Sequence, residues 1–134
     1  MDPKALITGV AHLGIRVRDL EVSRRFYEQL GFEFVIGPVG PEPVAILKHP
    51  GGVEINLILN ASDETPSNVL MDVDAKHAGY THVALKITDT DAAKALLDAA
   101  EIPLSGGPND YPNGARGMFL RDPDRNVIEL YQPG

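Results

Sequence analysis

An internal repeat limits the folds open to this chain more than any other feature of its sequence. Residues 10–34 and 80–104 can be laid over each other at an offset of 70 residues without a gap. His12 then falls on His82, and an Asp falls on an Asp seven positions later. A shared pattern of strand and helix would not by itself place identical polar residues together, so the sequence predicts a duplicated structural unit.

Each copy begins with a strand and continues into a helix. Residues 13–18 alternate between apolar and polar side chains, which is the period of a strand with one buried face. Asp19 follows at the place of a helix N-cap, apolar residues recur every four positions up to Leu30, and Gly31 can end the helix. The second copy repeats this pattern after His82.

Glycine and proline residues divide the rest of each copy into further strands. The expected strands are residues 33–36, 44–48 and 53–59 in the first copy and residues 117–121 and 126–131 in the second. Residues 61–78 are expected to form a polar connector, and residues 105–114 a loop over one end of the second copy. The sequence thus predicts a single α+β domain over residues 1–134, built from βαβββ modules at 8–60 and 79–131.

Composition excludes several classes of function. The chain has 12 basic and 19 acidic residues and a net charge of −7, which disfavours nucleic acid or an anionic membrane as a partner. It has no cysteine, so disulfides, thiolate ligands and thiol nucleophiles are excluded. No secretory signal and no apolar run of about 18 residues is visible, and we therefore expect a cytoplasmic protein that acts on a small molecule.

Side-chain alternation along the strands predicts a metal site. His12 lies on the face of the first strand opposite the apolar face that must cover the helix, and His82 does so in the second copy. Glu54 and Glu129 interrupt the apolar last strands on the same helix-free faces, where a lone carboxylate is costly to bury. If the two sheets curl toward each other, two imidazoles and two carboxylates converge and can hold a divalent cation.

The less specific interpretation of each residue remains open at this point. A single strand His is most often an ordinary, partly buried residue, and a single strand Glu usually faces solvent. The metal hypothesis is favoured because the two His and the two Glu are expected at matching places in the two copies. His49, in a turn, and His77, in the connector, are expected at the surface.

Two motifs resemble a known family. One is the segment 12–20, HLGIRVRDL, with Phe26-Tyr27 and the Leu-Gly-Phe of residues 30–32, and the other is FLRDPDRNVIE at residues 119–129. Together they resemble the vicinal oxygen chelate superfamily, which includes glyoxalase I, extradiol dioxygenases, methylmalonyl-CoA epimerase, and fosfomycin- and bleomycin-resistance proteins. The resemblance extends over nearly the whole chain. It implies paired βαβββ modules that form an incomplete barrel around a metal, and a homodimer.

The branches of this superfamily differ in their metal ligands. The His-Glu-His-Glu set of bacterial glyoxalase I would correspond to His12, Glu54, His82 and Glu129. Methylmalonyl-CoA epimerases usually have Gln at the place of Glu54. Extradiol dioxygenases have an iron triad that matches His12, His82 and Glu129, with no carboxylate at the Glu54 place, and metal-free antibiotic-binding relatives lack the ligands. Glu54 therefore favours a proton-transfer enzyme with one divalent metal, for which Ni, Co or Zn is favoured and Mn or Fe is possible.

The resemblance implies a lyase of the glyoxalase I kind as the expected function. Such an enzyme moves a proton on the hemithioacetal of methylglyoxal and glutathione and yields S-lactoylglutathione. Glu129 is the first candidate for the base, with Glu54 as its counterpart. The alternatives are an Fe(II) extradiol dioxygenase that opens a catechol ring, and a metal-free module that binds an antibiotic in the manner of bleomycin-resistance proteins.

Two arginines are candidates for contacts to the substrate. Arg16 stands where glyoxalase I has an Arg that binds a glutathione carboxylate. Arg116 is expected to lie in the loop and to offer a second anion contact from it. One feature departs from glyoxalase I: an Asn commonly lies four residues after the first Glu ligand, and counting from Glu54 gives Ile58.

Overall fold

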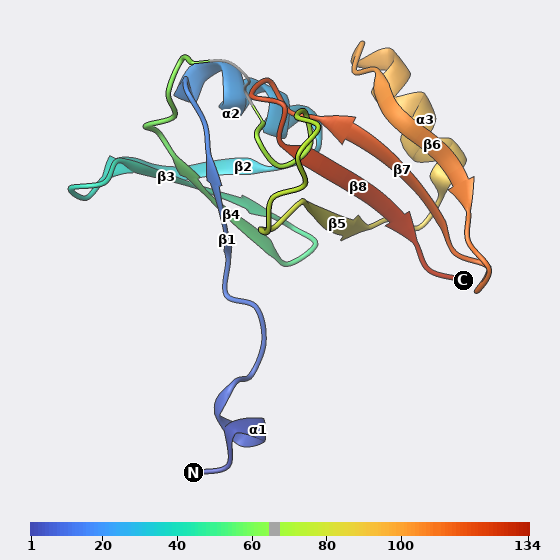
Figure 1. The fold of residues 1–134 in the computed structure, drawn as a ribbon, viewed down its shortest axis with the longest axis horizontal. Coiled ribbons are helices and arrows are strands. Elements are labelled where there is room, and N and C mark those ends of the chain that lie inside the picture. Colours follow the sequence, from blue (N-terminus) through green and yellow to red (C-terminus); the bar gives the residue numbers. More distant parts are fainter. Residues whose placement is uncertain (65–67) are drawn as a thin grey trace. The chain divides into compact units, whose positions relative to one another are not determined.

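The computed structural model describes residues 1–64 and 68–134. It consists of two compact units, Met1–Ser62 and Asp63–Gly134, each with one four-stranded mixed sheet and one helix of ten residues (Figure 1). Within these described ranges, no helix has the length and apolar character needed to cross a bilayer. The predicted α+β class with two βαβββ modules is confirmed.

Unit 1 folds from the N-terminal half of the chain. Its elements are α1 Pro3–Leu6, β1 Leu13–Arg16, α2 Leu20–Gln29, β2 Glu33–Val39, β3 Val44–His49 and β4 Val53–Ile58. The strand order is β1-β4-β3-β2, with β1 parallel to β4 and the other neighbours antiparallel. The first strand therefore lies beside the last one, which brings residues from the two ends of the module together.

Unit 2 repeats this topology. Its elements are β5 His82–Lys86, α3 Thr90–Ala99, β6 Leu104–Asp110, β7 Arg116–Arg121 and β8 Val127–Gln132, in the order β5-β8-β7-β6. The prediction of a loop over residues 105–114 is wrong in its first part, because most of that segment belongs to β6. An edge strand tolerates the Gly and Pro residues that suggested a loop, and its pairing with β7 is interrupted by register shifts.

The two copies have one difference in length. Val39 at the end of β2 pairs with Val44, five positions later, whereas the equivalent Asn109 of β6 pairs with Gly117, eight positions later. The helices keep the offset of the sequence repeat, since α2 begins at Leu20 and α3 at Thr90. The second copy therefore has three extra residues between these paired positions, and β7 and β8 match β3 and β4 at an offset that is larger by three.

Each sheet buries one face against its helix. The fully or nearly fully buried apolar side chains of unit 1 include Phe26 and Tyr27 on α2 and Leu47, Ile55 and Leu57 on the sheet. In unit 2, α3 packs against β7 and β8. Burial of one such side chain stabilises the fold by about 1.5–3 kcal/mol. The opposite face of each sheet is free of helix, as the alternation pattern predicts.

The helix starts confirm the predicted capping. The carboxylate of Asp19 accepts a hydrogen bond from the backbone N–H of Val22 at 3.0 Å, and that of Asp89 accepts one from Ala92 at the same distance. Each side chain satisfies a backbone donor that the first helical turn leaves without a partner.

His49 has a structural role, and the prediction that it lies at the surface is wrong. The ring is half-buried at the end of β3, where Nε2 lies 3.0 Å from the carbonyl oxygen of Leu30 and Nδ1 accepts the Gly51 N–H at 2.9 Å. It packs edge-on against Phe32, with 5.0 Å between ring centroids. A Cβ at Gly31 would come within 2.8 Å of His49 Nε2, so this glycine, with φ of +95°, makes room for the ring.

Replacement of His49 by Ala is expected to lower the free energy of unfolding by about 1–3 kcal/mol, because both hydrogen bonds and the ring packing are lost. Urea denaturation followed by circular dichroism measures the change. The matched control is His77→Ala, since His77 is exposed as predicted, and a surface change of this kind shifts stability by less than about 0.5 kcal/mol. Equal midpoints for the two variants would contradict the structural role of His49.

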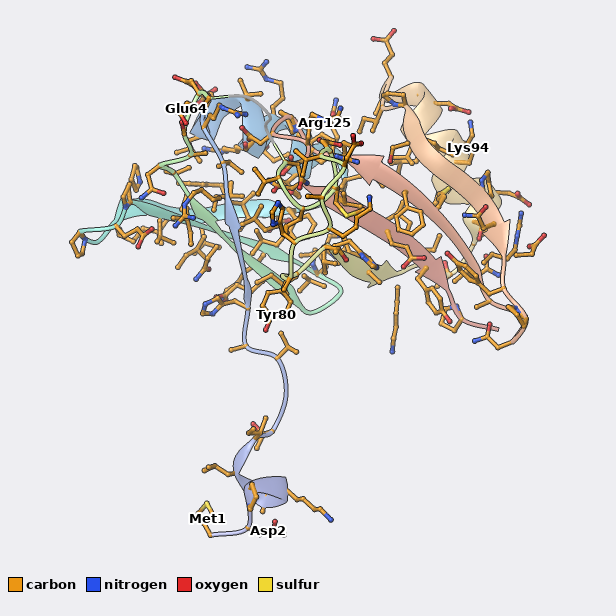
Figure 2. The ribbon with its side chains drawn as sticks, viewed as in Figure 1. Met1, Asp2, Glu64, Tyr80, Lys94 and Arg125 are labelled. Carbon is orange, nitrogen blue, oxygen red and sulfur yellow. The ribbon has the colours of Figure 1, made fainter. Side chains whose placement is uncertain are left out.

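The connector of unit 2 is held by an ion-pair cluster. The carboxylate of Asp72 accepts hydrogen bonds from Arg125 at 2.7 and 3.1 Å and from Arg121 at 3.2 Å, and Arg125 lies in the turn between β7 and β8 (Figure 2). These guanidinium contacts, the hydrogen bond from Arg125 first, hold the pKa of Asp72 below its usual value. Residues 65–67 of the predicted connector lie outside the described residues. The part around Asp72 is attached to the turn between β7 and β8 and is therefore not a plain polar connector.

Candidate functional site

A pocket of about 540 Å³ lies on the helix-free face of unit 2. Its walls are His82 from β5, Phe119 from β7, Glu129 and Tyr131 from β8, and residues 111–113 from the loop between β6 and β7. All of these residues belong to one unit. The pocket therefore combines aromatic side chains with one imidazole and one carboxylate.

Glu129 is the buried acidic group of this pocket. The residue is only 7% exposed, and its neighbours across the sheet are Ala84 on β5 and Phe119 on β7. Its Oε2 accepts a hydrogen bond from the Tyr111 hydroxyl at 2.8 Å, and its Oε1 lies 3.5 Å from His82 Nε2. These partners offset the cost of burying a carboxylate. The bond to Glu129 also raises the pKa of Tyr111, so the phenol keeps its proton and remains a donor.

Gly117 gives this carboxylate the room that it needs. The residue is buried on β7, and a Cβ at this position would lie 2.5 Å from Glu129 Oε2 and 2.8 Å from the Tyr111 hydroxyl oxygen. Any other residue would push the two groups apart. The contact between Glu129 and Tyr111 therefore needs a glycine at this position because the two side chains occupy the space of a Cβ. The backbone conformation of Gly117 does not require a glycine.

His82 is oriented by contacts on both sides of its ring. Its Nδ1 lies 2.9 Å from the Thr81 hydroxyl, and its ring meets Phe119 edge-on at 5.7 Å between centroids. With Nδ1 engaged, Nε2 is the nitrogen turned toward Glu129. A histidine fixed in this way presents one ring nitrogen as a ligand or as a hydrogen-bonding group.

Unit 1 has a second, more open pair. His12 immediately precedes β1, and its Nδ1 lies 3.9 Å from Glu54 Oε2 on β4. The other oxygen of Glu54 lies 3.6 Å from the Lys48 ammonium nitrogen. The His12 side chain is 48% exposed and the Glu54 side chain 28%. The carboxylate of this pair is thus shared with a cation, unlike that of Glu129.

Glu54 and Glu129 do not occupy matching places in the strand register of the two units. The prediction that they do is therefore wrong. Gly14 of β1 pairs with Asn56, whereas its equivalent Ala84 of β5 pairs with Glu129. Asn56 is therefore the equivalent of Glu129. The alternation pattern could not reveal the difference, because residues two apart on a strand share a face.

Asn56 has an unusual environment. Its side-chain oxygen is buried, and no donor within the described ranges reaches it. A buried acceptor without a partner is costly. An oxygen of this kind on the helix-free face has a free lone pair to offer to a bound group.

The donor set fits a divalent cation. Two atoms bound to one cation at about 2.1 Å each lie about 3.0–3.5 Å apart. The His82–Glu129 pair, at 3.5 Å, already has this separation, and the His12–Glu54 pair, at 3.9 Å, is slightly wider. No group of three or more His, Asp or Glu residues is gathered in the part of the chain that the structure describes. Each unit thus supplies one nitrogen–oxygen pair, and the four-ligand set stays a prediction.

Arg16 belongs to a polar cluster in unit 1. Its Nε donates to the side-chain oxygen of Asn60 at 2.9 Å and its Nη2 to Glu42 at 3.2 Å, and the Asn60 amide also donates to Glu42 at 3.2 Å. The hydrogen bonds from Asn60 and Arg16 lower the pKa of Glu42. A carboxylate already lies against the arginine that was predicted to bind one.

Arg116 lies away from the acidic pocket. It is the first residue of β7 and not part of a loop, and its guanidinium contacts Asp110 at 3.0 Å and Asp91 of α3 at 3.7 Å. Alternation along β7 puts Arg116 on the helix side of the sheet and Phe119 on the side of Glu129. Within its unit, Arg116 therefore does not lie beside the predicted ligands His82 and Glu129.

Tyr111 is the residue of this site that the sequence analysis missed. It lies in the connection that is three residues longer in the second copy than in the first, next to Pro112 in a segment typical of a loop. The signal that could have found it is the extra length of this connection, which appears once the strands of the two copies are matched.

Comparison with known proteins gives a family and a fold. The family model described as Glyoxalase/Bleomycin resistance protein/Dioxygenase superfamily matches residues 9–130. A comparison with curated proteins found no match.

Solved structures share the fold over nearly the whole chain. A glyoxylase/bleomycin resistance protein/dioxygenase domain from Frankia sp. EAN1pec is 21% identical, with 96% of this chain and 93% of that chain covered and a TM-score of 0.78. The genomically encoded fosfomycin resistance protein FosX from Listeria monocytogenes is 17% identical, with 96% and 95% covered and a TM-score of 0.71. Lactoylglutathione lyase from Agrobacterium tumefaciens is 21% identical, with 94% of each chain covered and a TM-score of 0.67.

At these identities the structural likeness shows the fold alone, whereas the family model spans most of the sequence. The matched residues 9–130 include both motifs and Glu129 with all the other residues that line its pocket except Tyr131. As the motifs predicted, the chain belongs to the Glyoxalase/Bleomycin resistance protein/Dioxygenase superfamily.

Proposed function

We propose that this protein is a metal-dependent lyase of the glyoxalase I kind, which converts the hemithioacetal of methylglyoxal and glutathione to S-lactoylglutathione. The observation that carries the proposal is the Glu129 carboxylate, which is buried in a pocket, held by Tyr111 through Oε2 and 3.5 Å from His82 through Oε1. A carboxylate held in a fixed orientation and shielded from bulk water is suited to remove a proton from carbon.

One divalent metal, Ni, Co or Zn in preference to Mn or Fe, would be held by His12, His82, Glu129 and Glu54, with the amide oxygen of Asn56 as a competitor for the place of Glu54. Bound there, the metal would supply Lewis-acid polarisation of the substrate oxygens. The two ligand pairs would come from one chain or from two chains of a homodimer. The support for this ligand set is that each unit has a His–carboxylate pair, His12–Glu54 at 3.9 Å and His82–Glu129 at 3.5 Å.

The proton transfer is assigned to Glu129. Its Oε1, once released from the metal, would accept the proton from the carbon that carries the hydroxyl and return it to the neighbouring carbon, which was the carbonyl carbon. The hydroxyl proton would pass to the former carbonyl oxygen, so that the atoms of substrate and product balance. The electrons stay within the substrate, so no nicotinamide is consumed. Tyr111 holds the second oxygen throughout, so the carboxylate does not need to rotate between the two steps.

Glutathione is proposed as the thiol on the basis of Arg16 and Asn60. The Asn that the glyoxalase I resemblance implies four residues after the first ligand is absent when counted from Glu54. It is present as Asn60 when counted from Asn56, the equivalent of Glu129. A glutathione carboxylate at Arg16 would replace Glu42, whose own carboxylate already lies there. The Arg16 guanidinium thus already binds one carboxylate, which supports the proposal that it can bind a carboxylate of glutathione.

An Fe(II) extradiol dioxygenase is the second candidate, and one observation favours it. Because Asn56 and not an acid stands at the equivalent of Glu129, the residues at matching places are two His and a single Glu. This combination of His12, His82 and Glu129 resembles the iron triad of that branch.

The test is metal analysis of the purified protein, followed by assays with each divalent metal. We expect lyase activity with methylglyoxal and glutathione that a chelator removes and that Ni²⁺, Co²⁺ or Zn²⁺ restores. Anaerobic loading with Fe²⁺ and exposure of catechol to the enzyme in air tests the second candidate. Ring cleavage without lyase turnover would overturn the lyase proposal in favour of the dioxygenase, and absence of any bound metal would favour an antibiotic-binding module.

A further inference from the structure

Tyr111 is a polar group of the pocket that touches Glu129 and that the proposed reaction does not use as a ligand or base. Its hydroxyl donates to Glu129 Oε2 at 2.8 Å, and no element of the sheet carries it, because it lies in the loop between β6 and β7. The connection that carries Tyr111 is three residues longer than its counterpart in unit 1. This longer connection places one donor on one oxygen of Glu129.

The position of Tyr111 is supported from two sides. Its ring stacks on Tyr131 of β8, with 6.1 Å between centroids and 23° between planes, and Asn113 from the same loop donates to the Tyr131 hydroxyl at 3.3 Å. The missing side chain at Gly117 leaves the space in which the phenol and carboxylate meet. The contact is thus held by packing as well as by the hydrogen bond.

We propose that Tyr111 is a positioning residue, which fixes the Glu129 carboxylate so that Oε2 is occupied and Oε1 is left facing His82 for the reaction. This rests on the proposed function in one respect, the assignment of Glu129 as ligand and base. A partner that orients a ligating carboxylate typically changes metal affinity or activity by 10–100-fold when it is removed. The benefit comes from orientation, because the hydroxyl satisfies one oxygen and so leaves the carboxylate a single open atom.

The main test is Tyr111→Phe, which keeps the ring on Tyr131 and removes only the hydroxyl. We expect the affinity for Co²⁺, titrated by its visible absorption, to fall about tenfold or more, and kcat to fall by a similar factor with little change in KM. The control is Tyr80→Phe, because Tyr80 is 99% exposed and lies outside the pocket. Unchanged Co²⁺ affinity together with unchanged kcat would overturn the proposal, since a merely structural tyrosine would leave both intact in a folded variant.

A second readout does not depend on metal or turnover. In a crystal structure of the metal-free Tyr111→Phe protein, we expect the Glu129 carboxylate to leave its wild-type position or to occupy several rotamers. A carboxylate that keeps a single wild-type position would overturn the role of Tyr111 even if the protein proved to have another activity. Conversely, a displaced carboxylate in a protein that binds no metal would uphold the positioning role and reject the proposed function.

Gly117→Ala provides an independent variant. Its added Cβ would press against both Glu129 Oε2 and the Tyr111 hydroxyl, so it should separate the pair without removing either group. We expect it to lower Co²⁺ affinity in the same direction as Tyr111→Phe, and the double variant to lose little more than the greater of the two single losses. Additive losses would show that the two residues act separately, and would overturn the proposal.

Discussion

The variant Glu129→Gln is expected to lower kcat of the lyase reaction by about 10²–10⁴-fold, the contribution typical of a positioned general base. Glutamine has nearly the same shape, and its carbonyl oxygen can still accept the hydrogen bond that Tyr111 donates at 2.8 Å. The substitution therefore removes the basic group while keeping the local packing. Steady-state kinetics with the reconstituted enzyme give kcat and KM, and circular dichroism checks that the variant is folded.

Glu33→Gln is the matched control, since Glu33 is exposed at the start of β2. It carries the same change of charge and is expected to leave kcat within about twofold, because it lies outside the pocket. A Glu129→Gln enzyme that keeps more than about a tenth of the wild-type kcat would reject Glu129 as the base. The role of base would then pass to another carboxylate, for which Glu54, 3.9 Å from His12, is the next candidate.

Features that depend on neighbouring residues could be predicted from the sequence. The alternation of residues 13–18 gives the correct buried and exposed faces of β1, and the two Asp caps give the correct helix starts. The offset of 70 between His12 and His82 holds for the strands and helices that begin each module. In each case, the physical cause acts over a few residues, so the pattern is visible in a short window.

Features that depend on strand register could not be predicted in this way. The sequence places Glu54 and Asn56 on the same face of one strand, and only the pairing with Gly14 decides which of them matches Glu129. The numerical correspondence between the two copies shifts by three positions at an earlier connection, where the second copy has its extension. A difference of two positions along a strand, about 7 Å, is enough to change which group meets a bound ligand.

The contacts of half-buried polar residues were the other source of error. His49 was expected at the surface because a turn surrounds it, yet the backbone of Leu30 and of Gly51 provides partners that keep the ring packed. Arg116 was assigned to a loop, whereas the edge strand β6 extends far enough to pair with it. Turn-forming residues reveal where a chain bends but not which side chains fold back over the bend.

A substitution in the turn between β7 and β8 is expected to lower stability more than the other substitutions considered. Asp122 is only 3% exposed, and its Oδ1 accepts the backbone N–H groups of Asp124 and Asn126, both at 2.9 Å. Its Oδ2 accepts the side-chain amide of Asn126 at 2.9 Å. One carboxylate therefore satisfies three donors in a turn whose residue Arg125 has a positive φ of 65°.

Asp122→Ala is expected to lower the free energy of unfolding by about 3–5 kcal/mol, because hydrogen bonds to a charged group contribute about 1.5–3 kcal/mol each and their losses overlap. Urea denaturation measures it, with Asp74→Ala as the control at an exposed Asp that should shift stability by less than about 0.5 kcal/mol. The turn directly precedes β8, which carries Glu129, so the variant should also bind Co²⁺ more weakly at low temperature, where it is still folded. A loss below about 1 kcal/mol would show that the backbone of the turn is stable without the carboxylate, and that the Asp-Pro-Asp-Arg-Asn motif serves β8 in some other way.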